Sequence, residues 1–283
     1  MSEKLPYNPS KNPFSDELDH TWNKYTHEAN HIATGGESEV YELIGRPDIV
    51  VKFDWGVTLQ IANENAKQNL PMDALDDKRF KALKNKLREE EKAYNDFKKY
   101  FGSHALVQKR YFIKIPYHKL ETWIIEGINN YKTTVEPSEY IWTIARIQRR
   151  VNFDKYERVF EGEFEDNGSV LGPDIADFIN ETEPGFQRML KDFVERAVKY
   201  TIDTGHILDI TGRKNIVFLK SVHGWDYKLI DVFFAGTPRL QRAREGDRSA
   251  IINANNYLHA ILKLSKNLGI DDGLKDFIEL FDY

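Results

Sequence analysis

The sequence contains no cysteine. This absence excludes a disulfide-stapled scaffold, a thiolate zinc site and a cysteine nucleophile. The chain also lacks the apolar run of about 18 residues that crossing a bilayer requires. Its N-terminus has no signal-peptide pattern. We therefore expect a cytoplasmic protein with no membrane partner.

An excess of positive charge is absent as well. Lys and Arg total 40 against 45 Asp and Glu, and the formal charge of −5 disfavours nucleic acid as a partner. Two basic segments, residues 145–150 and 239–248, are better explained as a surface cluster or as a contact for an acidic substrate. The eight histidines are scattered and do not form the His-x₃-His pair of a helical metal site.

The order of hydrophobic patterns predicts strands, a helical region, further strands and then mostly helices, which is an α+β arrangement. Strand-like runs occur at residues 31–33, 40–44, 49–53, 109–115, 122–128, 140–151, 215–219 and 227–234. Helical patterns occur at residues 58–101, with Gly102 as the stop, at 184–200 and at 249–268. Residues 1–30 are polar and interrupted by prolines, which predicts an arm or docking segment ahead of domains at 31–151 and 152–283.

The first candidate for a binding site is the bend that contains Gly35 and Gly36. Small residues at the tip of a hairpin let backbone N–H groups approach phosphate oxygens closely. Val40 would begin the second strand of this hairpin and cover an adenine ring. An ordinary turn is the alternative, because Gly-Gly hairpins are common.

The second candidate is an ion pair between a strand and a helix. Lys52 stands in an apolar strand, where a charged side chain needs a partner or a ligand, unless strand alternation turns it outward to solvent. Glu89, Glu90 and Glu91 lie on the Lys/Glu-rich helical stretch. Glu90 best matches an inward position and could pair with Lys52, and Glu91 is the second choice. A solvated acidic face is the alternative.

The third candidate is a set of oxygen ligands in the C-terminal half. Asp209 follows a helix, Asn215 opens one strand and Asp231 closes the next. Asn215 and Asp231 could hold Mg²⁺, a cation that prefers carboxylate and carbonyl oxygens. Asp209 could accept a proton from an attacking hydroxyl or orient it. The alternative is a β-hairpin with polar ends.

In this order, the motifs of the N-terminal half resemble those of the protein-kinase-like fold family. Its motif G-x-G-x-x-G-x-V matches at Gly35 and Val40, with Ala33 and Ser38 in place of the first and third glycines. Lys52 matches the lysine of V-A-I-K.

The remaining motifs of the family follow further along the chain. Glu90, or Glu91, matches the helical glutamate that pairs with the lysine. Asp209 and Asn215 match the Asp and Asn of the catalytic loop, and Asp231 matches the Asp of D-F-G.

The sequence departs from the family pattern in several places. Ile207 and Leu208 replace the His-Arg that precedes the catalytic Asp, and the Asp-to-Asn spacing is six residues instead of five. Asp231-Val232-Phe233 replaces Asp-Phe-Gly, and no Ala-Pro-Glu motif follows. With these departures, the sequence resembles a compact, atypical member of the family, closer to bacterial and small-molecule kinases.

The resemblance implies a two-lobed fold with a small β-rich N-lobe and a compact, shortened helical C-lobe. It implies an ATP- and Mg²⁺-dependent phosphotransferase that moves the γ-phosphoryl group to a hydroxyl of a protein or small-molecule acceptor. Two other functions stay open on the same fold: an inactive pseudokinase that acts as a protein-binding module, and a nucleotidyl transferase. The hinge that binds adenine is expected at residues 147–151, with 123–128 as the alternative.

Overall fold

The computed structural model describes residues 29–34, 38–43, 46–71, 74–106, 108–116, 140–151, 158–160, 183–210, 215–230, 237–270 and 274. The chain divides into two compact units. Unit 1 comprises Met1–Glu91 and Val107–Arg150, and unit 2 comprises Lys92–Leu106 and Val151–Tyr283. Each unit combines helices with antiparallel strands, so the chain is of the α+β class. Among the described helices, none is long and apolar enough to span a membrane.

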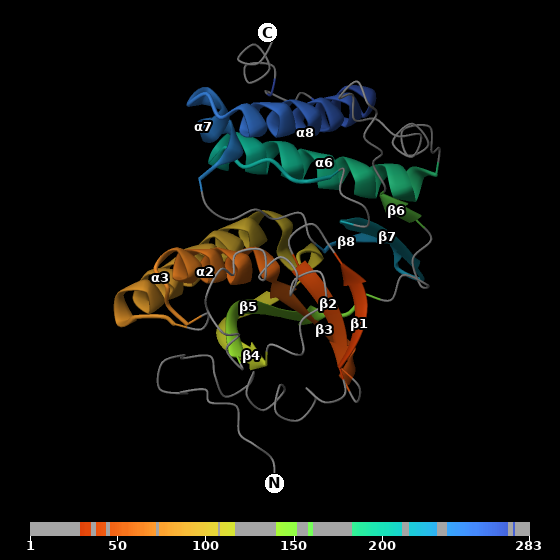
Figure 1. Cartoon of the computed structure of the whole chain (residues 1–283). Helices are drawn as coiled ribbons and strands as arrows, with labels where there is room; N and C mark the ends of the chain where they lie inside the picture. Colours follow the sequence, from red (N-terminus) through yellow and green to blue (C-terminus); the bar gives the residue numbers. More distant parts are fainter. Residues whose placement is uncertain are drawn as a thin grey trace. The chain divides into compact units, whose positions relative to one another are not determined.

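Unit 1 contains a five-stranded antiparallel sheet (Figure 1). Its strands are β1 (Ala29–Thr34), β2 (Ser38–Leu43), β3 (Arg46–Asp54), β4 (Gln108–Pro116) and β5 (Tyr140–Arg149). The spatial order is β1-β2-β3-β5-β4, so β4 is an edge strand and β5 pairs with β3. These strands match the runs predicted at 31–33, 40–44, 49–53, 109–115 and 140–151. The run predicted at 122–128 lies outside the described residues.

The helical region predicted at 58–101 is two helices, α2 (Trp55–Lys67) and α3 (Asp77–Phe101). The side chain of Asp54 caps α2 by accepting a hydrogen bond from the backbone N–H of Val57 at 3.2 Å. The chain leaves the helical path after α2 at Asn69, which has a φ of +53°. The predicted stop at Gly102 is confirmed, since α3 ends at Phe101 and Gly102 has a φ of +55°.

Both helices supply apolar side chains to a small core in unit 1. Val57 and Ile61 of α2 and Leu87 of α3 pack with Ile144 of β5. Trp142, two residues earlier on β5, meets the ring of Phe80 edge-on. Because side chains two residues apart on a strand share a face, α2 and α3 cover the face of β5 that carries these two residues.

Within the described residues, unit 2 contains a three-stranded antiparallel sheet and three α-helices. The strands are β6 (Arg158–Phe160), β7 (Ile216–Ser221) and β8 (Gly224–Leu229), in that spatial order. The helices are α6 (Pro184–Thr204), α7 (Arg239–Arg244) and α8 (Arg248–Asn267), and a short 3₁₀ turn, η3 (Gly102–His104), also belongs to this unit. The predicted helices at 184–200 and 249–268 are therefore confirmed, whereas α7 was not predicted.

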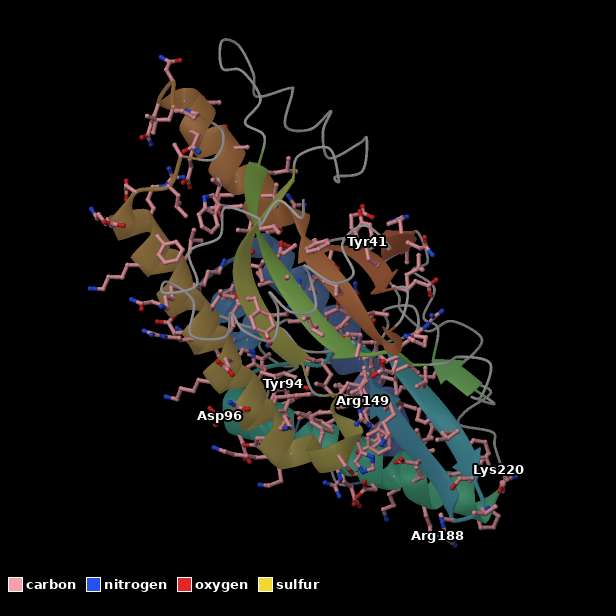
Figure 2. All side chains as sticks on the ribbon, turned by 90° about the horizontal axis from the view of Figure 1, so that it is seen from below. Tyr41, Tyr94, Asp96, Arg149, Arg188 and Lys220 are labelled. Atoms are coloured by element: carbon pink, nitrogen blue, oxygen red, sulfur yellow. The ribbon has the colours of Figure 1, made fainter. Side chains whose placement is uncertain are left out.

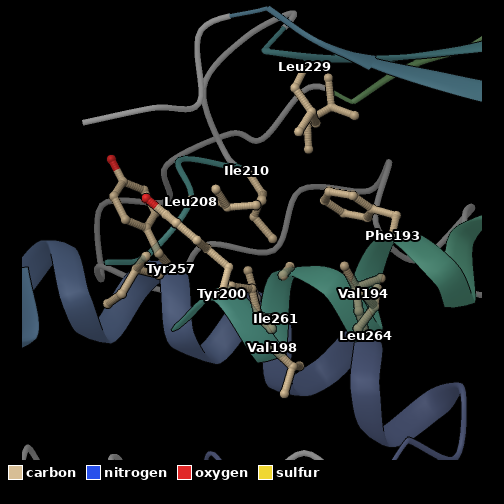
Figure 3. Close-up of a cluster of buried hydrophobic side chains, with 14 of the residues drawn as sticks. Phe193, Val194, Val198, Tyr200, Leu208, Ile210, Leu229, Tyr257, Ile261 and Leu264 are labelled. Atoms are coloured by element: carbon tan, nitrogen blue, oxygen red, sulfur yellow. The ribbon is translucent and has the colours of Figure 1, made fainter. Parts of the chain in front are cut away.

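The core of unit 2 forms where α6 and α8 pack together (Figure 3). The apolar face expected on α6 is buried throughout: Phe186, Leu190, Phe193, Ala197 and Tyr200. The end of α3 also contributes. Tyr94 is buried on one side of this helix, whereas the side chain of Asp96 on the other side is 47% exposed (Figure 2).

Candidate functional site

In unit 1, the candidate residues form a row across four neighbouring strands. Lys52 of β3 lies opposite Val40 of β2 on one side and Arg146 of β5 on the other. Arg146 in turn lies opposite Arg110 of β4. Directly opposite residues of antiparallel strands point to the same face of the sheet. One face of the sheet therefore carries all four residues, and three of them are cations: Lys52, Arg110 and Arg146.

This row lies on the face that α2 and α3 cover, because Arg146 is two residues from Ile144 on β5. Lys52 is only 6% exposed, so the alternative of an outward-facing lysine is wrong. The side chains of Arg110 and Arg146 are 6% and 14% exposed. Buried cations are stable only beside carboxylates, other acceptors or an anionic ligand.

Two carboxylates accompany the three cations. Oε2 of Glu90 on α3 lies 3.8 Å from Nε of Arg110. Oδ2 of Asp54 lies 3.4 Å from an Nη atom of Arg146, while its Oδ1 caps α2. Burial raises the pKa of Glu90, and the charges of Arg110, Lys86 and Arg146 oppose that rise only in part. Burial thus opposes the charged form of Glu90, while the neighbouring cations favour it.

The predicted inward position of Glu90 agrees with its exposure. Its side chain is 19% exposed, whereas Glu89 is exposed. The ion pair that the structure shows for Glu90 goes to Arg110. Sequence reasoning missed Arg110 and Arg146 as site residues. A signal was present, because each is a cation within a β-branched or aromatic strand run, as Lys52 is.

The predicted phosphate loop is described only at its two ends. Gly35 and Gly36 lie outside the described residues. On either side of them, Ala33 pairs with Val40, and Thr34 pairs with Glu39. Val40 is partly buried on the same face as Lys52. The flanking strands β1 and β2 thus pair with each other, and β2 places Val40 next to the basic row.

In unit 2, the structure brings Asp209 and Asn215 together. The Nδ2 atom of Asn215 donates a hydrogen bond to the backbone carbonyl of Asp209 at 3.0 Å. The carbonyl of Asn215 accepts a hydrogen bond from the backbone N–H of Ile230 at 2.8 Å. Using Nδ2 as the donor fixes the amide and leaves Oδ1 as its acceptor atom. Asp231 lies outside the described residues.

Sequence reasoning also missed Tyr257 of α8 and Arg239 of α7, which lie together in unit 2. Burial raises the pKa of Tyr257, and so does the negative charge of Asp209. Cζ of Arg239 lies 4.9 Å from the centre of the Tyr257 ring, in a cation–π contact. Burial, and then the charge of Arg239, lower the pKa of His206. No short-range pattern links residues 239 and 257, so only tertiary structure could reveal their contact.

The position of Asp209 follows from the end of α6. This helix stops at Gly205, which has a φ of +70° and accepts a hydrogen bond from the backbone N–H of Leu240 at 3.2 Å. A Cβ atom at Gly205 would lie 3.2 Å from Cβ of Pro238, so glycine permits the close approach of α7. Leu208 and Ile210, which flank Asp209, are both fully buried (Figure 3). The buried side chains of Leu208 and Ile210 therefore fix the backbone on both sides of Asp209.

The two groups differ in the ligands that their chemistry suits. Buried Lys and Arg side chains suit phosphate oxygens, and amide and carboxylate oxygens suit Mg²⁺. Within the described part of the chain, no three His, Cys, Asp or Glu side chains gather as a metal site. A comparison with models of known protein families and a search of curated proteins both find no match for this chain.

Proposed function

We propose that the protein is an ATP- and Mg²⁺-dependent phosphotransferase of atypical kinase-like fold. It would transfer the γ-phosphoryl group of ATP to a hydroxyl group on a protein or small-molecule acceptor. The bond from the γ-phosphorus to the bridging oxygen breaks, ADP leaves, and a new bond forms to the acceptor oxygen, whose proton is released. The observation that carries this proposal is the burial of Lys52 on the helix-covered face of the sheet, in one row with Arg146 and Arg110.

The arrangement of unit 1 supports nucleotide binding there. Kinases carry their phosphate-binding lysine on the third strand of the sheet and pair it with a glutamate on the helix that follows. Lys52 is on β3, and Glu90 is on α3, which precedes β4. In the proposed complex, Gly35 and Gly36 cradle the phosphates and Val40 covers the adenine. Lys52 neutralises the phosphate charge, and Glu90 helps to hold the basic row.

The link between Asp209 and Asn215 supports the chemical step in unit 2. In the kinase pattern the catalytic-loop Asp orients the acceptor hydroxyl and the Asn holds Mg²⁺. The hydrogen bond from Asn215 Nδ2 to the Asp209 carbonyl fixes both residues in one local structure, despite the extra residue in their spacing. Asn215 and Asp231 would hold Mg²⁺, which neutralises charge on the phosphates when bound. Asp209 would accept the hydroxyl proton or orient the hydroxyl.

The first test is thermal unfolding of the full chain with ATP, with and without Mg²⁺. Ligand at 100 times its Kd adds about 2.7 kcal/mol, which raises Tm by a few degrees. We expect this Mg²⁺-dependent shift in the wild type and its loss in Lys52→Ala. The control is Lys81→Ala, which removes an exposed lysine of α3 and should keep the full shift. Wild-type protein without any shift would contradict nucleotide binding.

The second test measures turnover, because nucleotide binding alone also fits a pseudokinase. Asp209→Asn should lower turnover by about 10²- to 10⁴-fold and keep the Mg²⁺–ATP shift in Tm. Mass spectrometry of the products separates the remaining alternatives. ADP and a phosphorylated acceptor support phosphoryl transfer, whereas pyrophosphate and a nucleotidylated product indicate the nucleotidyl transferase. A shift in Tm without any product indicates the protein-binding pseudokinase.

A further inference from the structure

Arg146 of β5 stands at the centre of the basic row, and none of the sequence motifs accounts for it. It lies directly opposite Lys52 of β3 on one side and opposite Arg110 of β4 on the other. The Cβ atoms of directly opposite residues are about 5 Å apart, so like charges at such positions repel each other. All three side chains are also largely shielded from water. Repulsion and burial both cost free energy, and an anion beside the row would offset that cost.

The carboxylate of Asp54 supplies part of this negative charge from a fixed position. Its Oδ1 accepts a hydrogen bond from the N–H of Val57 at 3.2 Å. The backbone carbonyl of Asp54 accepts hydrogen bonds from the hydroxyls of Thr58 at 3.2 Å and Thr143 at 3.0 Å. Oδ2 of this aspartate lies 3.4 Å from an Nη atom of Arg146, which is longer than the about 2.7–2.9 Å of a strong charge-assisted hydrogen bond. Asp54 thus orients the guanidinium without binding it tightly.

The guanidinium of Arg146 therefore retains donors for a ligand. An arginine carries five N–H donors in a planar fork. Among the described residues, the contact with Asp54 is the one hydrogen bond that this guanidinium donates. The side chain of Arg146 is 14% exposed, against 6% for Arg110, so it is the more accessible of the two arginines. The planar fork matches two oxygens of one phosphate group.

We propose that Arg146 is a second phosphate-binding residue beside Lys52, and that the basic row binds a chain of linked phosphates in preference to a single phosphate. The inference deepens the proposed function and rests on it for the identity of the ligand as ATP. Adjacent strands are about 4.8 Å apart, so Lys52, Arg146 and Arg110 extend over two strand spacings. One phosphate group is too small to span this distance, whereas the linked phosphates of a triphosphate can contact successive cations.

The experiment measures the Kd of inorganic tripolyphosphate and of orthophosphate for the full chain, by isothermal titration calorimetry at fixed ionic strength. These probes carry no adenine, so their binding depends on the phosphate contacts alone. The wild type should bind one tripolyphosphate per chain at least about tenfold more tightly than orthophosphate. Arg146→Gln should weaken tripolyphosphate binding about tenfold, as expected for the loss of one charge-assisted contact, and should reduce the preference over orthophosphate.

Two further variants serve as control and as second test. Arg88 is an exposed arginine of α3, two residues before Glu90, so Arg88→Gln makes the same chemical change outside the row and should keep the wild-type Kd. Arg146→Lys retains the positive charge beside Asp54 but loses the planar fork. It should weaken tripolyphosphate binding by a smaller factor, about threefold. This variant tests the inference even if Arg146→Gln does not fold.

A purely structural role for Arg146, as the ion-pair partner of Asp54, predicts a different result. Arg146→Gln would then have a lower Tm and an unchanged Kd for tripolyphosphate. Wild-type affinity in Arg146→Gln, or in Arg146→Lys if the first variant does not fold, would overturn the inference. Equal affinities of the wild type for tripolyphosphate and orthophosphate would overturn it as well.

The same measurements distinguish failure of this inference from failure of the proposed function. A Mg²⁺–ATP shift in Tm that is lost in Lys52→Ala and kept in Arg146→Gln, with an unchanged Kd for tripolyphosphate, would overturn the inference and leave the proposed function standing. Tripolyphosphate binding that depends on Arg146, without any Mg²⁺–ATP shift, would overturn the proposed function and support the phosphate contact of Arg146. Wild-type protein that binds neither tripolyphosphate nor ATP would overturn both.

Discussion

In unit 1, the side chains of Lys52, Arg110 and Arg146 lie largely buried in one row of the sheet. The core of unit 2 around α6 and α8 consists mainly of apolar and aromatic side chains, and the buried polar residues of these two helices are Thr201, Asn256 and Ser265. The candidate residues of the two units therefore differ in how deeply they are buried. In unit 1 they are part of the interior. In unit 2, Asp209 sits between two buried neighbours but is itself only partly buried.

In unit 1, stability and function should therefore depend on the same residues. In unit 2, they should depend on different residues. An apolar core is stabilised by the area it buries, and a residue at its margin can change without loss of that area. A buried charge costs desolvation free energy and is retained only where partners or a ligand compensate for it. Substitutions in unit 1 should therefore alter stability and nucleotide binding together, while those at Asp209 should alter catalysis alone.

The largest effect on stability is expected from a substitution that creates a cavity in the apolar core of unit 2. Phe193 of α6 is 1% exposed and packs edge-on against Tyr227. Phe193→Ala should lower the free energy of unfolding by about 3–5 kcal/mol, measured by urea denaturation. The control on the same helix is Ile202→Ala, because Ile202 is 43% exposed and this variant should lose about 0.5 kcal/mol or less. A loss for Phe193→Ala that is as small as the control's would show that this interior is loosely packed.

A smaller effect is expected from two aspartates that cap helices, one in each unit. Asp54 caps α2 and faces the buried Arg146, whereas Asp247 caps α8 and pairs with Arg242, whose side chain is 46% exposed. Asp54→Ala should cost about 2–3 kcal/mol, since it removes a cap and leaves a buried cation without that partner. Asp247→Ala should cost less, because water solvates Arg242.

Two further variants separate the contribution of the helix cap from the contribution of the charge. Asn retains the capping oxygen and removes the charge, so Asp54→Asn should still be clearly destabilising and Asp247→Asn nearly neutral. Urea denaturation of all four proteins measures the differences. Equal losses for Asp54→Asn and Asp247→Asn would show that the charge around Arg146 adds nothing to stability, and would remove the contrast between the two units.

Much of this architecture could be predicted from periodicity. The apolar spacing of Phe186, Leu190 and Phe193 defined the buried face of α6, and the β-branched run around Val50 and Val51 defined β3. Gly102 marked the end of α3 because a left-handed residue stops a helix. Such signals are local, and the sequence displays them directly.

The partners of the candidate residues could not be predicted in the same way. Arg146 meets Lys52 because β5 pairs with β3, and Arg110 joins them because β4 pairs with β5. Arg146 is 94 positions from Lys52 and 36 positions from Arg110 in the sequence. Arg239 of α7 likewise reaches the ring of Tyr257 on α8 through helix packing. The sequence can show that Lys52 and Asp209 need partners, and only the sheet order and the helix packing identify those partners.

The smallest effect on stability, and the most informative about unit 1, is expected from Glu90→Gln. Burial raises the pKa of Glu90 above its ordinary 4.5, despite the opposing charges of Arg110, Lys86 and Arg146. A carboxyl group whose pKa is raised by folding favours the native state when it is protonated. The wild type should therefore lose stability as pH rises from about 4.5 through the raised pKa.

Gln resembles the protonated carboxyl group, so Glu90→Gln should be as stable as the wild type at neutral pH or more stable, and its stability should depend less on pH above 4.5. Urea denaturation at several pH values measures this, with Glu89→Gln, on the exposed side of the same helix, as the control. If the charge of Glu90 also helps to hold the basic row for a nucleotide, the same variant should show a smaller Mg²⁺–ATP shift in Tm. If Glu90→Gln is as stable as the wild type or more stable and binds the nucleotide more weakly, unit 1 retains a destabilising charge because it serves ligand binding. If the variant is less stable than the wild type at neutral pH, Glu90 forms an ordinary structural ion pair.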